Sequence, residues 1–356
     1  MIMNKSLLMK KLLCLQGNRY AGGVLAALAL LTIFFSSFSA LAQSEEERLP
    51  DFFVQSFLDL PEDAAEASQE GKLLLLYFGQ PGCPYCKQLL ETNFARKDIA
   101  DKTRKHFLPL AFNIFGDREA TWFDGKQHNE KSLAVFLRVQ FTPTVLLVDT
   151  TGKILVRMNG YYPPHRFSRA LDYAVLRLDK KNKGFAEYMR GIGKQKGASA
   201  KLHQKPFFMG APYDLRRNKG DKPLAVFFET RYCAPCDEIH KDGFKRAKMK
   251  KALANFETAR FALGGTEMLT TPTGDKIKAA DWARQLKVNY TPSVVFFDDS
   301  GKEVFRLEAY VRPFHLSSSF EYVGSGAYKN EPEFQRFLHE KTARIREQGK
   351  KVELWK

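Results

Sequence analysis

The chain repeats itself once, with 149 to 150 residues between equivalent positions. The motif C-P-Y-C at 83–86 aligns with C-A-P-C at 233–236, and "FLRVQFTPTVLLVDTTGK" aligns with "QLKVNYTPSVVFFDDSGK". This period is far longer than the units of roughly 20 to 50 residues that stack into solenoids. The repeat therefore predicts two complete domains of one fold, and 356 residues are enough to build both.

Each copy shows the same order of apolar and turn-rich stretches. A short apolar run, 72–78 or 224–228, is typical of a buried strand, and the C-x-x-C follows it. We expect next a helix, a second strand, a Gly-containing loop with a short helix, two strands joined by a Gly-containing turn, and a last helix. This order predicts an α/β fold, with a mixed central sheet flanked by helices in each domain.

The first 42 residues have the features of an export signal. Lys5, Lys10, Lys11 and Arg19 precede an apolar stretch at 21–42 that ends in Ala-Leu-Ala. A positive flank, an apolar middle and small residues at the end are typical of a cleavable signal peptide, which predicts a periplasmic protein. An uncleaved membrane anchor is the alternative, because the apolar stretch is nearly long enough to span a bilayer.

The rest of the chain divides where its composition changes. Domain 1 is expected at 43–190 and domain 2 at 207–340. Residues 191–206 are rich in Gly, Lys and Ser and predict a flexible linker, and residues 341–356 predict a charged C-terminal tail.

Cysteine usage indicates redox chemistry. The chain has five cysteines, and Cys14 lies in the expected signal, so the mature protein keeps four, all in the two C-x-x-C pairs. In an exported chain, exchange with other disulfides is the natural use for such pairs. The net charge of +16 is spread without a basic stripe interleaved with aromatic residues, so nucleic acid is not expected as a partner.

The spacing within each pair indicates a mechanism. Two cysteines three positions apart at a helix start can bridge each other, and the free backbone N–H groups there stabilise a thiolate at the first. Cys83 or Cys233 would attack a partner's disulfide, and the more buried Cys86 or Cys236 would then resolve the mixed disulfide.

The two motifs differ in the charges that follow them. Lys87 follows the first pair and favours a thiolate, whereas Asp237 and Glu238 follow the second and disfavour one if they face it. We therefore expect Cys83 to be the more acidic thiol and the outward-facing nucleophile, ahead of Cys233.

A Thr-Pro dipeptide follows each pair, its proline 60 or 59 residues after the first cysteine. Thr142-Pro143 and Thr291-Pro292 open the third expected strand, where a proline is a candidate for a cis peptide bond. Because proline offers no N–H, the backbone of the threonine is left free to pair with an extended substrate peptide. These dipeptides are the predicted substrate-binding loops.

With these motifs, each half resembles a thioredoxin-fold domain. The stretches "QPGCPYC", "FGDREATWFDGK" and "YTPSVVFFDDSGKEV" resemble the SoxW-type periplasmic thioredoxins, which are associated with bacterial sulfur oxidation. The tandem arrangement departs from the single domain of that family. Ordinary thioredoxins also have a buried acid six residues before the first cysteine, where this chain has Tyr77 and Phe227.

The resemblance implies a thiol–disulfide oxidoreductase that needs no cofactor or metal and acts on protein thiols and disulfides. It further implies a reductant of a sulfur-oxidation or other cysteine-bearing carrier protein. Its electrons would come from a membrane thiol–disulfide carrier of the DsbD or CcdA kind.

Other uses of the cysteines stay open. The two pairs could form one tetrahedral zinc site, although each lies inside its own repeat. They could be inert disulfides, although a loop closed between positions i and i+3 adds little stability. The rival to an enzyme is then a non-catalytic binding module that docks a partner or binds a metal. A relay between the domains and two independent sites are equally compatible with the sequence.

Overall fold

The computed structural model describes residues 48–181, 184–190, 199, 201–308, 311–352 and 354. The expected signal peptide at 1–42 and positions 191–198 and 200 of the expected linker lie outside the described residues. The chain from Leu49 onward forms one compact unit. None of the described helices combines the length and the apolar character that crossing a bilayer requires.

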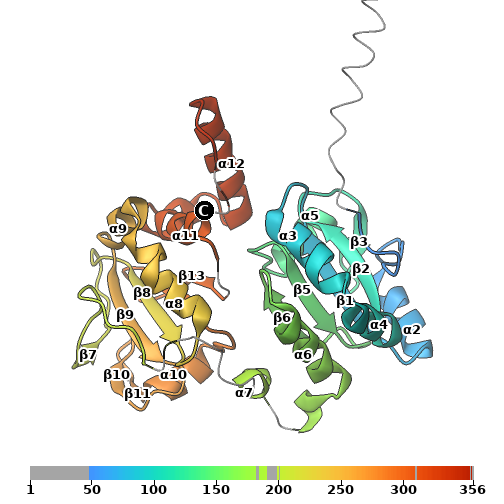
Figure 1. Ribbon diagram of the computed structural model, residues 1–356, viewed down its shortest axis with the longest axis horizontal. Helices are drawn as coiled ribbons and strands as arrows, with labels where there is room; N and C mark the ends of the chain where they lie inside the picture. The colour runs from blue at the N-terminus through green and yellow to red at the C-terminus, as the bar shows by residue number, and fades with distance from the viewer. Residues whose placement is uncertain are drawn as a thin grey trace, which may run out of the picture. The chain divides into compact units, whose positions relative to one another are not determined.

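The first half is built on a mixed sheet with the strand order β2-β1-β5-β6 (Figure 1). β1 pairs parallel with β2 and antiparallel with β5, and β5 pairs antiparallel with β6. The parallel pair requires a helical crossover, which contains the first C-x-x-C. The strands are β1 (Leu73–Gly79), β2 (Phe107–Asn113), β5 (Thr144–Val148) and β6 (Ile154–Asn159).

Helices cover both faces of this sheet. Alternate residues of β1 enter two different buried clusters, Leu75 and Tyr77 in one, and Leu74, Leu76 and Phe78 in the other. Burial of both faces explains why the run is apolar throughout instead of alternating. The helices are α2 (Leu60–Gln69), α3 (Pro84–Gln88), a π-helical continuation (Leu89–Phe94), α4 (Lys97–His106), α5 (Glu130–Phe136), α6 (Pro164–Val175) and α7 (Phe185–Arg190).

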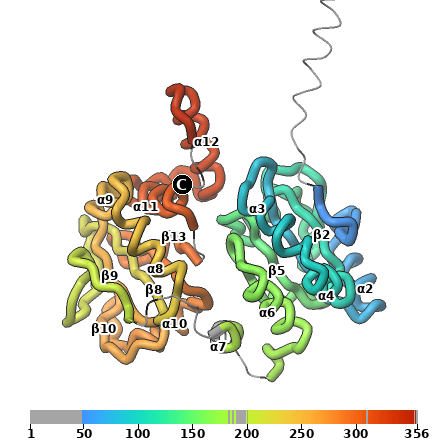
Figure 2. Tube along the Cα trace, viewed as in Figure 1, coloured from blue at the N-terminus to red at the C-terminus, as the bar shows by residue number. Residues whose placement is uncertain are grey.

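The second half repeats this architecture, with the strand order β13-β12-β8-β9 and the same pattern of parallel and antiparallel pairs. The Cα trace runs from blue to green through the first half and from yellow to red through the second (Figure 2). The predicted α/β fold with two mixed sheets is therefore confirmed. The elements are β8 (Leu224–Glu229), α8 (Ala234–Lys241), α9 (Ala247–Leu253), β9 (Glu257–Ala262), α10 (Ala279–Gln285), β12 (Ser293–Phe297), β13 (Glu303–Leu307), α11 (Pro313–Gly324) and α12 (Phe334–Glu347).

Two details differ from the sequence interpretation. The Gly-containing loop of each half is a small hairpin that turns at Gly125 or Gly274, where φ is +76° or +101°. The predicted start of the tail at residue 341 falls inside α12, which continues to Glu347. The hairpin strands, too short to show a period of two, are β3 (Glu119–Thr121), β4 (Gln127–Asn129), β10 (Met268–Thr270) and β11 (Lys276–Lys278), and β7 (Tyr213–Asp214) pairs with β10.

Candidate redox site

The first C-x-x-C lies where β1 ends and α3 begins. Cys83 and Cys86 are joined by a disulfide, and Cys83 is the N-cap residue of α3. The backbone N–H of Cys86 donates to the sulfur of Cys83 at 3.1 Å. A thiolate at Cys83 would receive the same hydrogen bond, which stabilises the charged form.

The second C-x-x-C has the same construction. Cys233 and Cys236 form a disulfide, Cys233 is the N-cap residue of α8, and the N–H of Cys236 donates to its sulfur at 3.2 Å. The pairings that the spacing predicts are therefore present in both halves.

The Thr-Pro loops lie beside these pairs. The Thr142–Pro143 and Thr291–Pro292 peptide bonds are both cis, as the sequence suggested. The carbonyl oxygen of Thr142 lies 3.5 Å from the sulfur of Cys83. In the second half, the hydroxyl group of Thr291 is 3.2 Å from that of Thr230, which precedes the C-x-x-C. The structure thus brings the predicted loop and the predicted nucleophile together in the first half.

The expectation that the leading cysteine faces solvent is wrong for this structure. Cys83 is 3% exposed and Cys233 is 2% exposed, close to the 0% and 2% of the resolving cysteines Cys86 and Cys236. Cys83 belongs to a buried cluster that includes Tyr290, the residue before the second Thr-Pro. Tyr290 lies 4.7 Å from the ring of Tyr162, and the guanidinium of Arg166 lies over it at 5.6 Å. The second half therefore covers the first site.

Phe141, the counterpart of Tyr290 in the repeat, packs in the opposite direction. Its ring lies 5.8 Å from that of Phe305 and 5.7 Å from that of Phe334, in the core of the second half. Both aromatics serve core packing, as the sequence suggested, but each packs in the core of the other half. Thr142 and Thr291 are buried as well, so a substrate peptide can pair with them only after this packing opens.

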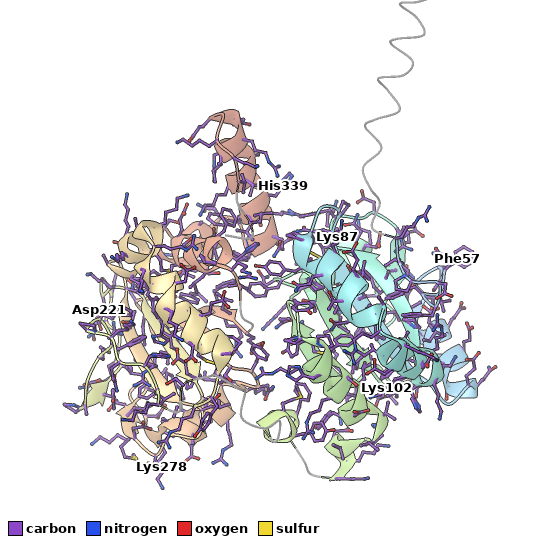
Figure 3. All side chains as sticks on the ribbon, in the orientation of Figure 1. Phe57, Lys87, Lys102, Asp221, Lys278 and His339 are labelled. Atoms are coloured by element: carbon purple, nitrogen blue, oxygen red, sulfur yellow. A yellow bond between two sulfur atoms is a disulfide. The ribbon has the colours of Figure 1, made fainter. Side chains whose placement is uncertain are left out.

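The charged residues that follow the pairs all have side-chain partners. Lys87, on α3, lies 3.8 Å from Glu91 (Figure 3). The carboxylate of Asp237 is hydrogen-bonded to His203 at 2.6 Å, and that of Glu238 forms an ion pair with Arg312 at 3.0 Å. Because Glu238 is paired with a cation and Asp237 is held by a hydrogen bond, the two carboxylates disfavour a thiolate at Cys233 less than their charges alone suggested. The order of acidity of Cys83 and Cys233 stays a prediction.

Part of the expected linker is bound at the second pair. The backbone N–H of Ser199 donates to Asp237 at 2.8 Å, and its carbonyl accepts from the N–H of Tyr232, next to Cys233, at 2.7 Å. His203 binds the other oxygen of the same carboxylate. These contacts place linker residues beside Cys233.

Arg312 connects the helices that begin at the two pairs, and sequence reasoning missed it. Its backbone N–H donates to the hydroxyl of Tyr85, inside the first C-x-x-C, at 3.0 Å, while its guanidinium binds Glu238 on α8. Burial raises the pKa of Tyr85 to about 12, so the phenol stays protonated at neutral pH. The contact joins residues 227 positions apart, and no local pattern in the sequence signals it.

His315 makes this region sensitive to acid. Its ring packs on that of Tyr85 at 5.3 Å, and burial, with a smaller contribution from Lys341, lowers its pKa to about 4. The unfolded chain takes up this proton near pH 6.5 but the folded chain only near pH 4, so the folded state loses stability as the pH falls through that window. The full loss is about 3 kcal/mol.

We therefore expect His315→Gln to reduce the loss of unfolding free energy between pH 7 and pH 4 by about 3 kcal/mol. Urea unfolding at both pH values measures this difference. The exposed His339, on α12, provides the matched control, because His339→Gln should leave the pH dependence as it is (Figure 3). Equal acid sensitivity in the His315 variant and the unmodified chain would contradict the assignment.

Known proteins share the fold of both halves. The family model described as a thioredoxin-like domain matches residues 60–175 and again 215–324. No curated protein matches the chain.

Three solved structures illustrate the likeness. A thioredoxin-fold protein from Helicobacter pylori is 25% identical, with a TM-score of 0.33, and the match covers 41% of this chain and 89% of that one. A thioredoxin from Thermus thermophilus is 22% identical, with a TM-score of 0.29, over 36% and 92%. The C-terminal domain of DsbD from Neisseria meningitidis is 14% identical, with a TM-score of 0.23, over 34% and 89%.

Proposed function

This chain belongs to the thioredoxin-like domain family, and we propose that it works as a periplasmic reductant of disulfide-bearing proteins. Two family domains, each with a disulfide at C-x-x-C spacing, make it a thiol–disulfide oxidoreductase. The observation that carries the proposal is the first site. There the sulfur of Cys83 accepts a hydrogen bond from the backbone N–H of Cys86 and lies 3.5 Å from the carbonyl oxygen of Thr142.

The proposed roles follow from these positions. Cys83 and Cys233 attack the substrate disulfide, and Cys86 and Cys236 resolve the mixed disulfide. The backbones of Thr142-Pro143 and Thr291-Pro292 hold the substrate chain. In each cycle the protein's two thiols lose two electrons and two protons, and the substrate's S–S bond is replaced by two thiols.

The cellular setting is a proposal that rests on the sequence. The positive and apolar segment at 1–42 supports export to the periplasm, with cleavage after Ala42. The resemblance of the motifs to SoxW-type thioredoxins supports a cysteine-bearing carrier of sulfur oxidation as the substrate. A membrane carrier of the DsbD or CcdA kind would then supply the electrons.

One experiment tests the reaction itself. The reduced full chain is mixed with a cysteine peptide that carries glutathione in a disulfide, and the products are followed by mass spectrometry. We expect one glutathione released for each cysteine pair oxidised, at a rate roughly 100-fold or more above that of free cysteine. Cys86→Ser should instead accumulate the peptide in a mixed disulfide on Cys83.

The burial of both leading cysteines favours a second candidate, a docking module whose disulfides stay closed. Such a module would release glutathione no faster than free cysteine does, and Cys86→Ser would accumulate no adduct. That outcome would reject the enzyme and leave the docking role.

A further inference from the structure

A buried acid–base pair lies behind the second C-x-x-C. Glu229 is the last residue of β8 and is 0% exposed, and His240 on α8 is 1% exposed. The Nε2 atom of His240 lies 2.7 Å from Oε1 of Glu229. Buried ionisable groups are costly unless they are paired, so this pair is held in place by the fold.

The hydrogen bond determines which nitrogen is free. An ionised carboxylate can only accept, so Nε2 carries the proton and donates it to Glu229. Nδ1 then carries the lone pair, and among the described residues it has no hydrogen-bond partner. A carboxylate behind one nitrogen stabilises the imidazolium that forms when the other nitrogen takes up a proton. The arrangement is that of a base aligned by an acid.

The free base lies one helical turn from the resolving thiol. His240 follows Cys236 by four positions on α8, and residues at this spacing lie on the same face of a helix. Side chains on a helix also lean toward its N-terminus, which here is the end that carries the cysteines. The ring of His240 is therefore directed along the face that holds Cys236.

The first half has no such pair at the equivalent positions. A shift of 150 residues places Glu229 on Gly79 and His240 on Leu90. A side chain at Gly79 would have its Cβ 2.5 Å from the hydroxyl oxygen of Tyr77, so that phenol fills the space instead. In the second half the residue equivalent to Tyr77 is Phe227, which leaves room for the carboxylate. The acid–base pair is thus a property of the second half alone.

Other charged groups near the pair come from three elements. His203 of the linker stacks on His240 with ring centroids 4.5 Å apart and binds Asp237, which is also on α8. Arg260 of β9 is opposite Phe227 in the sheet register, hence on the face of the sheet that carries Glu229. Among the described residues, its Nε and Nη1 atoms have no hydrogen-bond partner. Phe208 and Phe244 also pack near the imidazole, with ring centroids 5.9 and 5.0 Å from it.

We propose that His240, positioned by Glu229, accepts the proton of the Cys236 thiol when that thiol resolves a mixed disulfide on Cys233. This inference rests on the proposed function. The proton moves from Sγ of Cys236 to Nδ1 of His240, and the thiolate attacks the sulfur of Cys233. The bond between Cys233 and the substrate breaks, the Cys233–Cys236 disulfide forms, and the departing substrate thiolate takes up a proton from solvent. Glu229 is a positioning residue in this step.

The test uses the full chain with Cys14→Ser, Cys83→Ser and Cys86→Ser, so that only the second pair reacts. The reduced protein is mixed with 5,5′-dithiobis(2-nitrobenzoate) in a stopped-flow instrument across pH 5 to 9. The first release of thionitrobenzoate reports attack by Cys233, and the second reports resolution by Cys236. We expect His240→Gln to slow the second release by about tenfold or more at pH 7 and to leave the first release within about twofold.

The pH profile separates a proton acceptor from a structural contact. In His240→Gln the rate of the second release should keep rising with pH to above about pH 8, as for an unassisted thiol. In the unmodified chain this rate should level off at a lower pH. Glu229→Gln should shift the profile in the same direction. His339→Gln, on α12, is the control and should leave the pH profile unchanged.

Two results would overturn the proposal: an unchanged second release in His240→Gln, or a slowing by the same factor at every pH. Failure of the proposed function would look different, because then the first release itself would be no faster than that of free cysteine. His240→Leu, which copies Leu90 of the first half, gives an independent reading in case the glutamine alters the fold.

Discussion

Replacing both leading cysteines by serine should reduce catalysed insulin reduction by roughly 100-fold or more, to the rate of dithiothreitol alone. Cys83 and Cys233 are the N-cap residues of α3 and α8, and the sulfur of each accepts a hydrogen bond from the backbone N–H of the second cysteine in its pair. Serine keeps the cap, but its hydroxyl cannot attack a disulfide and donate the electron pair that breaks the S–S bond. Insulin turbidity with dithiothreitol as the reductant measures the loss.

The single variants decide how the two sites cooperate. Independent sites predict that Cys83→Ser and Cys233→Ser each remove only their own share of the rate. A relay predicts that one single variant loses nearly as much as the double variant. Thermal unfolding is the control for folding, and a double variant that retains the rate of the unmodified chain would contradict the assignment of the nucleophiles.

Opening the cover over the first site should make Cys83 reactive. Tyr290 belongs to the second half, but it lies in the same buried cluster as Cys83 and packs on Tyr162 of the first half. We expect Tyr290→Ala to raise the rate at which iodoacetamide alkylates reduced Cys83 by about tenfold or more, because a thiol reacts only where the reagent can reach it. Mass spectrometry of the alkylated peptides distinguishes Cys83 from the other cysteines.

A second tyrosine serves as the matched control. Tyr328 also belongs to the second half, but it packs on Tyr322, in a buried cluster that does not contain Cys83. Tyr328→Ala should leave the alkylation of Cys83 unchanged. If Tyr290→Ala has no effect, or if both variants have the same effect, the burial of Cys83 does not depend on Tyr290.

Much of the fold is predictable from the sequence because local patterns indicate its elements, and the repeat shows each of these patterns a second time. Apolar runs such as 72–78 become β1, and the Thr-Pro dipeptides open β5 and β12 where the sequence places them. The cysteine pairing follows from spacing alone, since positions i and i+3 at a helix start are close enough to bridge. These features depend on neighbours in the sequence.

The missed features depend on contacts over long sequence distances. Tyr290 covers the cluster of Cys83, and Arg312 reaches both Tyr85 and Glu238, which no local periodicity signals. Glu229 lies at the end of β8 and His240 lies on the following helix, α8. In the sequence they stand out only because the equivalent residues of the first half, Gly79 and Leu90, are not polar. A comparison of the two halves for positions that are polar in one and apolar in the other could have identified this pair from the sequence.

The measurement that tests the central claim most directly is a glutathione redox titration of the full chain, read by mass spectrometry of the alkylated cysteines. We predict that Cys83–Cys86 and Cys233–Cys236 each convert reversibly between disulfide and dithiol in the folded chain, two electrons per pair, within the range of roughly −150 to −300 mV that glutathione buffers cover. Pairs that stay closed across this range, or that open only when the chain unfolds, would contradict a role in electron exchange.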